Sequence, residues 1–509
     1  MPEQFIPDPP TTSYWDASPD FRALCRRKLS ESAYAWAEPQ LAAMGEQAAR
    51  DVAPLAAIAD REQPRLITHD ARGERVSRVE YHPAYAEMER IAYGSGMIAM
   101  KYETHEHSQA SQLTGFALGY LFAMAELGLY CPLCMTDGVA RVLTRHGTHD
   151  QVTRVVPHLT SSDVRTLWTG GMFLTERIGG SDVGANQTVA RKNGDGTWRL
   201  TGHKWFCSNV DAEAVLVTAR IEGAGEGTRG LGTFLLLTRD NPGVCIERLK
   251  NKLGYRSMPT GEVTLNDAPA EQVGDFGPIT DMLNLSRIYT AVAACAALGR
   301  AVYEARHSIE RRQAFGRPII EWPLAQETFF DLEAEHVAAL LLTFETVDCL
   351  GRADAGDADA ARLLRLLIPV VKSVTAKLAV PCVSEAMELI GGNGYIEESP
   401  LPRLLRDAQV LPIWEGTTNI LVLDALRVAH KDATHELLLA RIHTRFPREA
   451  DALAYTFASL DEPDSRGWID RLARLYQLTL LLDAGHGEYA DRLVNRPLGL
   501  VPGARLGVR

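Results

Sequence analysis

The order of secondary-structure signals constrains the fold of this chain more than any other feature, because a strand-rich segment lies between two long helical ones. Apolar residues recur at helical spacing from about residue 17 to 159. From about 166 to 275, short strand-like runs alternate with turn clusters such as Asn193–Gly196. Long Ala/Leu segments return from about 282 to 430. This order predicts an α+β chain and not the alternating βαβ units of a Rossmann fold.

The same boundaries predict four parts. We expect an N-terminal α-helical domain over 1–165, a middle domain forming a small antiparallel β-barrel over 166–280, a C-terminal four-helix bundle over 281–430, and a helical extension over 431–509. The bundle is inferred only from helix lengths and from breaks at glycine and proline clusters.

Composition excludes several classes of protein. The chain has 509 residues, 46% of them hydrophobic and 23% charged, as in soluble globular proteins, and a net charge of −12 argues against a positive field over the whole molecule. The sequence contains no uninterrupted run of about 20 apolar residues, the length that a membrane-spanning helix needs. The segment Met1–Pro10 lacks the features of a signal peptide, and eight cysteines are too few for a disulfide scaffold. We expect a soluble, cytoplasmic protein.

Three local patterns have ordinary structural explanations. Gly225–Gly230 matches G-x-G-x-x-G, but a strand follows it where a dinucleotide site needs a helix, so we predict a hairpin loop. Cys131 and Cys134 form a lone C-x-x-C in apolar surroundings, which favours buried structural thiols. His105 and His107 offer too few ligands for a metal. No metal site is predicted.

Two clusters of small, hydroxyl and aromatic residues lie at the entry to the strand region. In the first, residues 172–182, glycines let the main chain approach a flat ligand and Thr175 and Ser181 offer hydroxyls. An ordinary Gly-Gly-Ser-Asp turn is the alternative. In the second, residues 202–209, Phe206 and Ser208 share a strand, and the alternative is a half-buried strand that pairs across a sheet.

A third cluster, residues 412–421, precedes an apolar run at a loop-to-helix junction. Thr417 or Thr418 could cap the helix, with Glu415 as a charge near its start. Alternatively, Glu415 is a general base whose pKa is raised by apolar neighbours such as Trp414. Residue types alone leave both interpretations open.

Together with two further segments, these clusters resemble the motifs of the acyl-CoA dehydrogenase family of flavoenzymes. The five matching segments are Leu174–Asp182, Lys204–Asn209, Arg311–Gly316, Glu388–Tyr395 and Trp414–Thr417. Arg177 and Trp414 replace the proline and tyrosine that are usual in the family. These departures, with Tyr81–Tyr85, Cys131–Thr136 and Glu397–Arg403, resemble the AidB-like branch. The resemblance covers nearly everything to about residue 430.

The resemblance implies FAD as cofactor and Glu415 as the base that removes the α-proton of an acyl thioester. It implies that the Glu415 backbone N–H and a ribityl hydroxyl of the flavin polarise the thioester oxygen. It assigns FAD contacts to Met172, Thr175, Ser181, Phe206, Ser208, Arg312, Phe315, Gly391, Gly392, Trp414, Thr417 and Asn419. Arg312 and Phe315 would reach the FAD of a neighbouring subunit, which implies a dimer or tetramer, and an electron-transfer partner is expected. Arg287 matches a CoA contact, but Asn284 replaces an aspartate usual in the family.

Three functions remain open at this point. The first is a working dehydrogenase of acyl-CoA or acyl-carrier thioesters, and the second is an AidB-like, DNA-associated protective flavoprotein of the alkylation response. DNA binding would use the arginines of 431–509, but this segment holds 11 basic and 11 acidic residues, so helices joined by salt bridges are favoured. The third is a flavoprotein that binds lipid without turnover.

Overall fold

The computed structural model describes residues 13–495, and these form two compact units. The helical unit contains 13–50, 105–125 and 290–495, and the sheet unit contains 51–104 and 126–289. Both units therefore take residues from the N-terminal helical segment. The expectation for Met1–Pro10 and the tail arginines Arg496, Arg505 and Arg509 lie outside the described residues.

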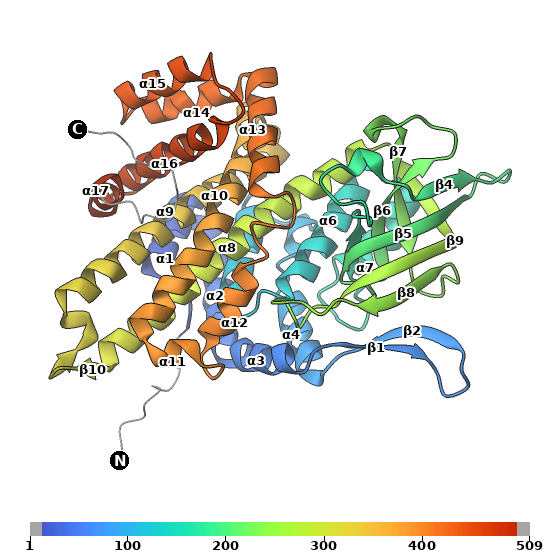
Figure 1. Ribbon diagram of the computed structural model, residues 1–509, viewed down its shortest axis with the longest axis horizontal. Coiled ribbons are helices and arrows are strands. Elements are labelled where there is room, and N and C mark those ends of the chain that lie inside the picture. Colours follow the sequence, from blue (N-terminus) through green and yellow to red (C-terminus); the bar gives the residue numbers. More distant parts are fainter. Residues whose placement is uncertain (1–12, 496–509) are drawn as a thin grey trace. The chain divides into compact units, whose positions relative to one another are not determined.

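The helical unit is built around long buried helices. Its helices are α1 (Pro19–Lys28), α2 (Glu31–Gln47), α5 (Ser111–Ala125), α9 (Pro323–Asp354), α10 (Ala358–Ile390), α11 (Gly392–Tyr395), α12 (Pro400–Ala408), α13 (Thr418–Asp432), α14 (Thr434–His443), α15 (Pro447–Phe457), α16 (Ser465–Asp483) and α17 (Gly487–Asn495). The second half of α8 (Gly277–Arg311) also belongs to it, from Thr290 onward. Helices α9, α10 and α13 pack together, and α16 packs on α9 (Figure 1).

Local sequence explains where these helices begin. Asp357 caps α10 by accepting a hydrogen bond from the Ala360 N–H, and Pro323 occupies the first turn of α9, where its missing N–H costs nothing. Nearly every residue of α5 is buried, so this helix is apolar on all faces and not amphipathic.

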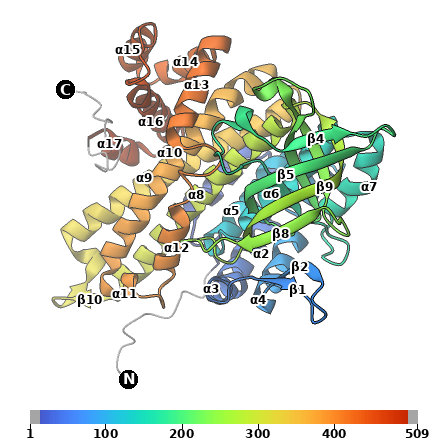
Figure 2. The same cartoon turned by 45° about the vertical axis from the view of Figure 1, so that its right-hand side comes forward.

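The sheet unit contains one seven-stranded sheet with helices beside it. Its strands are β3 (Gly170–Phe173), β4 (Val189–Lys192), β5 (Trp198–Ser208), β6 (Ala214–Ile221), β7 (Leu231–Leu237), β8 (Val244–Leu249) and β9 (Thr260–Gly274). The order β3-β6-β4-β5-β9-β7 closes on itself through the β6–β7 pairing. Strand β8 extends from β9, and Figure 2 shows β5, β9 and β8 in this order. Its helices are α3 (Ala53–Arg61), α4 (Pro83–Gly94), α6 (Tyr130–His146) and α7 (His149–Leu159).

The strands confirm the predicted β-domain but differ from it in two respects. Strand β6 pairs in parallel with both β3 and β4, so the barrel is mixed and not purely antiparallel. The N-terminal helical segment also contains a β-hairpin, β1 (Arg65–His69) with β2 (Arg75–Glu80). The tight turn at Asp70–Gly73 and the β-branched residues of its strands favour this hairpin despite the helical composition around it.

Two of the local patterns adopt the predicted structures. Residues 225–230 connect β6 to the antiparallel β7, so the glycine-rich motif is a hairpin loop. Cys131 and Cys134 are buried inside α6, and the eight cysteines, all within residues 13–495, form no disulfide. His105 and His107 pack against Trp36, with ring centroids 5.1 and 5.4 Å away.

Two helices within 13–495 are long and apolar enough to resemble membrane spans. They are α8 and α10, whose apolar windows are 83% and 78% buried inside the protein. Burial of this extent is what a core helix of a globular domain shows.

A half-buried carboxyl on α4 gives the sheet unit a pH-dependent stability. Burial, with the nearby charges of Asp211 and Glu213, raises the pKa of Glu89 to about 8 from an ordinary 4.5. The folded state therefore favours the neutral carboxyl, and this contribution is present below pH 4.5 and lost as the pH rises through about 8. We expect Glu89→Gln to gain stability relative to the native protein between pH 5 and pH 9, measured by urea unfolding.

Glu87→Gln is the matched control, because Glu87 is exposed on the same helix and pairs with Arg90. A stability difference for Glu89→Gln that does not change with pH would contradict the expectation.

Candidate functional site

The first cluster folds over a buried ion pair in the sheet unit. After β3, Leu174, Thr175 and Glu176 turn across the sheet, and the Trp205 N–H donates to the Thr175 carbonyl at 2.9 Å. Lys204 Nζ, fully buried, lies 2.8 Å from Glu176 Oε1 and also donates to the carbonyl of Thr218.

The Glu176 carboxylate is held by more than its lysine. It accepts backbone hydrogen bonds from Gln187 and Thr188. Burial alone would raise the pKa of Glu176, but Lys204 and these donors outweigh it and hold that pKa below its usual value. The loop is therefore anchored from beneath, while its hydroxyl and glycine residues face outward.

The geometry of this loop fits a flat, polar ligand. Gly180 lies so close to Thr175 that a Cβ on it would sit 2.6 Å from the threonine Oγ1. Ser181 is exposed, Met172 and Ser208 are half-buried, and the Phe206 ring on β5 is 55% exposed. An aromatic ring left this open beside hydroxyls and a glycine turn suits an isoalloxazine system with its ribityl chain.

The third cluster lies in the helical unit, between α12 and α13. Glu415 is half-buried and has a φ of +57°, and Gly416 follows with a φ of +102°. The left-handed conformation is unfavourable for glutamate, and non-glycine residues keep it where surrounding structure enforces it, often at functional sites. The positive φ of Glu415 therefore favours its catalytic interpretation.

The capping interpretation of this cluster is only half right. Thr417 occupies the N-cap position of α13, but its side chain makes no capping hydrogen bond. Asn419, in the first turn, is exposed. The start of α13 thus presents hydroxyl, amide and N–H groups that suit an anionic or polar ligand.

Lys372 lies on α10 and binds this loop from the side, and the sequence alone did not indicate that role. Its side chain is fully buried, and Nζ donates to the carbonyls of Trp414 at 2.7 Å and Gly416 at 2.6 Å. These two carbonyls flank Glu415. The available signal was a single charged residue, Lys372, within the largely apolar segment 366–376, where an unpartnered charge would be costly.

Two further predicted FAD residues meet elsewhere in the helical unit. Gly391 has a φ of +79°, and Arg312 packs on it with Nη1 3.3 Å from where a Cβ would stand. The exposed Gly392 follows at the start of α11. Glycine adopts this backbone conformation without strain, and a Cβ at this position would press on the Arg312 guanidinium.

Phe315 stands at the tip of a two-residue hairpin formed by β10 (Gln313–Ala314) and β11 (Arg317–Pro318). Its side chain is 93% exposed, with only an edge contact to Trp322. Such a projecting ring suits contact with another molecule. Arg287, the predicted CoA contact, is half-buried on the first half of α8.

Apart from Arg287, the predicted site residues therefore fall into three groups. Met172, Thr175, Ser181, Phe206 and Ser208 gather at one part of the sheet unit, and Trp414, Glu415, Thr417 and Asn419 form one loop of the helical unit. Arg312 and Gly391 form the third group, with Phe315 and Gly392 close to them in sequence. No cluster of three or more His, Cys, Asp or Glu side chains within 13–495 is arranged to hold a metal ion.

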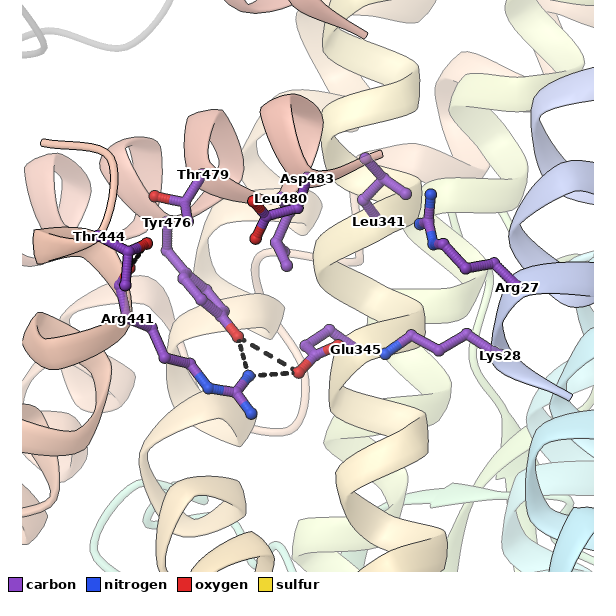
Figure 3. Close-up of a pocket in the computed structure, with 10 residues that line it drawn as sticks. All are labelled: Arg27, Lys28, Leu341, Glu345, Arg441, Thr444, Tyr476, Thr479, Leu480 and Asp483. Carbon is purple, nitrogen blue, oxygen red and sulfur yellow. Dashed lines mark hydrogen bonds and ion pairs between the residues drawn. The ribbon is translucent and has the colours of Figure 1, made fainter. Parts of the chain in front are cut away.

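A pocket of about 310 Å³ that shares no lining residue with these groups lies in the helical unit, where the C-terminal extension meets α1 and α9 (Figure 3). Glu345 is central to its wall: Lys28 pairs with it, Arg441 Nη1 lies 2.5 Å from its Oε1, and the Tyr476 hydroxyl also contacts it. Burial opposes ionisation of Glu345, but the two cations hold its pKa below the usual value. These charges neutralise one another, so the pocket is best explained by docking of the extension.

Other tail arginines are engaged in the same way. Arg445 pairs with Asp483, Arg474 with the buried Glu335, and Arg492 with Glu327. Each is an intramolecular ion pair, which supports the salt-bridge interpretation of the extension.

We expect Glu345→Gln to destabilise the helical unit by about 2 kcal/mol, because Lys28 and Arg441 would lose the carboxylate to which both bind. Equilibrium urea unfolding measures this loss. Asp483→Asn removes an exposed pair with Arg445 and is the control, expected to cost under about 1 kcal/mol. Equal losses for the two variants would contradict the central role of Glu345.

Three family models together match most of the chain from residue 9 to residue 430. The acyl-CoA dehydrogenase C-terminal domain matches residues 276–430, the middle domain of that family matches 171–268, and the N-terminal domain of adaptive response protein AidB matches 9–164.

Curated relatives and a solved structure point to the same family as these models. Acyl-CoA dehydrogenase family member 11 of Caenorhabditis elegans is 41% identical over 79% of this chain and 68% of its own length. Putative acyl-CoA dehydrogenase AidB of Escherichia coli is 35% identical over 81% of this chain and 77% of its own length. The crystal structure of C. elegans ACDH-11 in complex with C11-CoA superposes with a TM-score of 0.88, at 35% identity, over 95% of this chain and 91% of that one. This chain therefore belongs to the acyl-CoA dehydrogenase family of flavoenzymes, in the branch that contains AidB.

Proposed function

We propose that this protein catalyses the α,β-dehydrogenation of an acyl thioester, with Glu415 as the base and FAD as the hydride acceptor. The observation that carries the proposal is the half-buried Glu415 held in a left-handed loop at the start of α13. A base must be held at a fixed position over its substrate, and the φ of +57° fixes the Glu415 backbone in a conformation that side chains uncommonly adopt.

The chain's own residues have separate roles in this proposal. Thr175, Ser181, Phe206 and Ser208 bind the flavin in the sheet unit. Thr417 and Asn419 contact it from α13, beside Trp414. Met172, Gly391 and Gly392 complete the cradle at main-chain level. FAD, when bound, supplies the acceptor for the hydride that leaves the β-carbon.

Glu415 has two roles in the same loop. Its carboxylate takes the α-proton, and its backbone N–H donates to the thioester oxygen, where negative charge develops as that proton leaves. Arg287 binds the CoA part of the substrate. The relative solved with C11-CoA supports a CoA thioester as the delivered form, although an acyl-carrier thioester presents the same reacting atoms.

The proposal extends to partners and location. The projecting Phe315 supports an assembly of two or four copies in which this ring, with Arg312, reaches a neighbour's FAD. An electron-transferring partner reoxidises the flavin. Eight free cysteines agree with a reducing, cytoplasmic location. The arginines of the extension are paired with carboxylates of this chain, which favours the salt-bridge interpretation over DNA binding.

Anaerobic titration of the purified flavoprotein with CoA thioesters of increasing chain length tests this function. We expect at least one chain length to bleach the flavin absorbance at stoichiometric amounts. A flavin that dithionite bleaches but no thioester does would overturn the dehydrogenase function and favour a lipid-binding flavoprotein.

A further inference from the structure

The loop that carries Glu415 is held from behind by one buried ammonium group. Lys372 Nζ donates to the Trp414 carbonyl at 2.7 Å and to the Gly416 carbonyl at 2.6 Å. The side chain is fully buried, so these contacts are made in a low-dielectric interior where charge-assisted hydrogen bonds are strong.

The direction of these carbonyls determines the direction of two N–H groups. In a planar trans peptide, the C=O and the N–H point to opposite sides. The Trp414 carbonyl shares its peptide with the Glu415 N–H, and the Gly416 carbonyl shares its peptide with the Thr417 N–H. Because both carbonyls point toward Lys372, both N–H groups point away from it.

The backbone conformation fits this arrangement. The left-handed φ of +57° at Glu415 and the φ of +102° at Gly416 lie between the two peptides, and this turn lets alternate carbonyls converge on one cation. Backbone N–H groups that line one side of a turn form a concave site for an anion or a partial negative charge, and Glu415 and Thr417 supply the first and third N–H groups of this turn. The ammonium behind them also polarises both peptides, which strengthens the two donors.

We propose that Lys372 is a positioning residue for the oxyanion site of this enzyme: it aims the N–H groups of Glu415 and Thr417 at the thioester oxygen. The inference rests on the proposed dehydrogenase function. It assigns to Lys372 no contact with substrate or flavin, and it makes Thr417 a second main-chain donor beside Glu415.

Lys372→Met tests this role, because methionine keeps most of the side-chain length and removes the charge and the donors. Lys372→Gln retains neutral N–H donors on a shorter side chain and gives a graded second variant. Lys377→Met is the matched control, since Lys377 is exposed on the same helix. Flavin content and thermal unfolding are compared first, so that rates refer to folded, loaded protein.

We expect Lys372→Met to slow bleaching by the best thioester about 10- to 100-fold, because the donors remain but lose their aim. Lys372→Gln is expected to lie between it and the native protein. The KM should change less than kcat, because the interaction strengthens as charge develops on the oxygen.

A second readout reports the oxyanion site without turnover. The 3-oxoacyl analogue of the best thioester ionises to an enolate, whose ultraviolet absorbance measures how well the protein stabilises negative charge on that oxygen. In Lys372→Met we expect the pH midpoint of this ionisation to rise by one to two units, in line with the rate. Lys377→Met should leave both the rate and the midpoint unchanged.

The possible outcomes distinguish a failure of the dehydrogenase function from a failure of the role assigned to Lys372. If the native protein bleaches with no thioester, the dehydrogenase function fails and the role of Lys372 fails with it. If the native protein bleaches and folded Lys372→Met matches it in rate and enolate midpoint, only the assignment to Lys372 is wrong.

Discussion

Glu415→Gln should keep its bound flavin and lose thioester-dependent bleaching by about 10²- to 10⁴-fold, the range over which a positioned general base contributes to rate. Glutamine preserves the size of the side chain and the backbone N–H, so thioester binding should survive. Loss of the carboxylate removes the acceptor for the α-proton. Stopped-flow bleaching at saturating thioester measures the rate, and exchange of α-hydrogens with deuterated solvent measures proton abstraction separately.

Glu398→Gln is the matched control, because Glu398 is exposed in the same unit and belongs to no predicted FAD or substrate contact. It should bleach at the native rate. If Glu415→Gln bleaches as fast as this control, another group removes the proton and the assignment of the base is wrong.

Lys204→Met should destabilise the sheet unit by about 3 to 5 kcal/mol, the usual cost of leaving a buried charge without its partner. Glu176, a residue only 5% exposed, would remain beneath residues 174–182 with its cation removed. Because Lys204 also donates to the Thr218 carbonyl, the anchor of residues 174–176 is lost with it. Urea unfolding gives the stability change, and the flavin-to-protein ratio after gel filtration reports the loop.

Lys192→Met is the control for this change, since Lys192 is exposed on β4. The double variant Lys204→Met with Glu176→Gln should recover part of the lost stability, because the stranded charge is gone. A loss under about 1 kcal/mol for Lys204→Met alone would show that solvent or another cation compensates Glu176.

The order of helices and strands was largely predictable, because the spacing of apolar residues and the positions of glycine and proline identify these elements before any packing is known. The hairpin loop at Gly225–Gly230 followed from the strand on each side of it, and the junction before α13 followed from the apolar run after Thr417. The residues of the candidate site were predicted from family motifs and not from spacing, since Gly-Gly-Ser-Asp alone suits an ordinary turn equally well.

Features that depend on distant parts of the chain were not predictable. The parallel pairing of β6 with β3 joins segments about 40 residues apart, and no local pattern specifies it. The sequence alone does not show that Lys204 and Lys372 are buried. In the structure, each of them binds a turn formed by another segment of the chain. The ion pairs of the extension are of the same kind, because sequence shows equal numbers of charges but not their partners.

The left-handed glutamate described above has a consequence for how this protein changes over evolutionary time. A glycine at position 415 would adopt a φ of +57° without the steric cost that a side chain incurs, of order 1 kcal/mol. Under the proposed function, the chemistry of the carboxylate is what retains Glu415 against that replacement. Descendants that abandon thioester oxidation, and keep the flavin for another purpose, should be recognisable by glycine or asparagine at this one position.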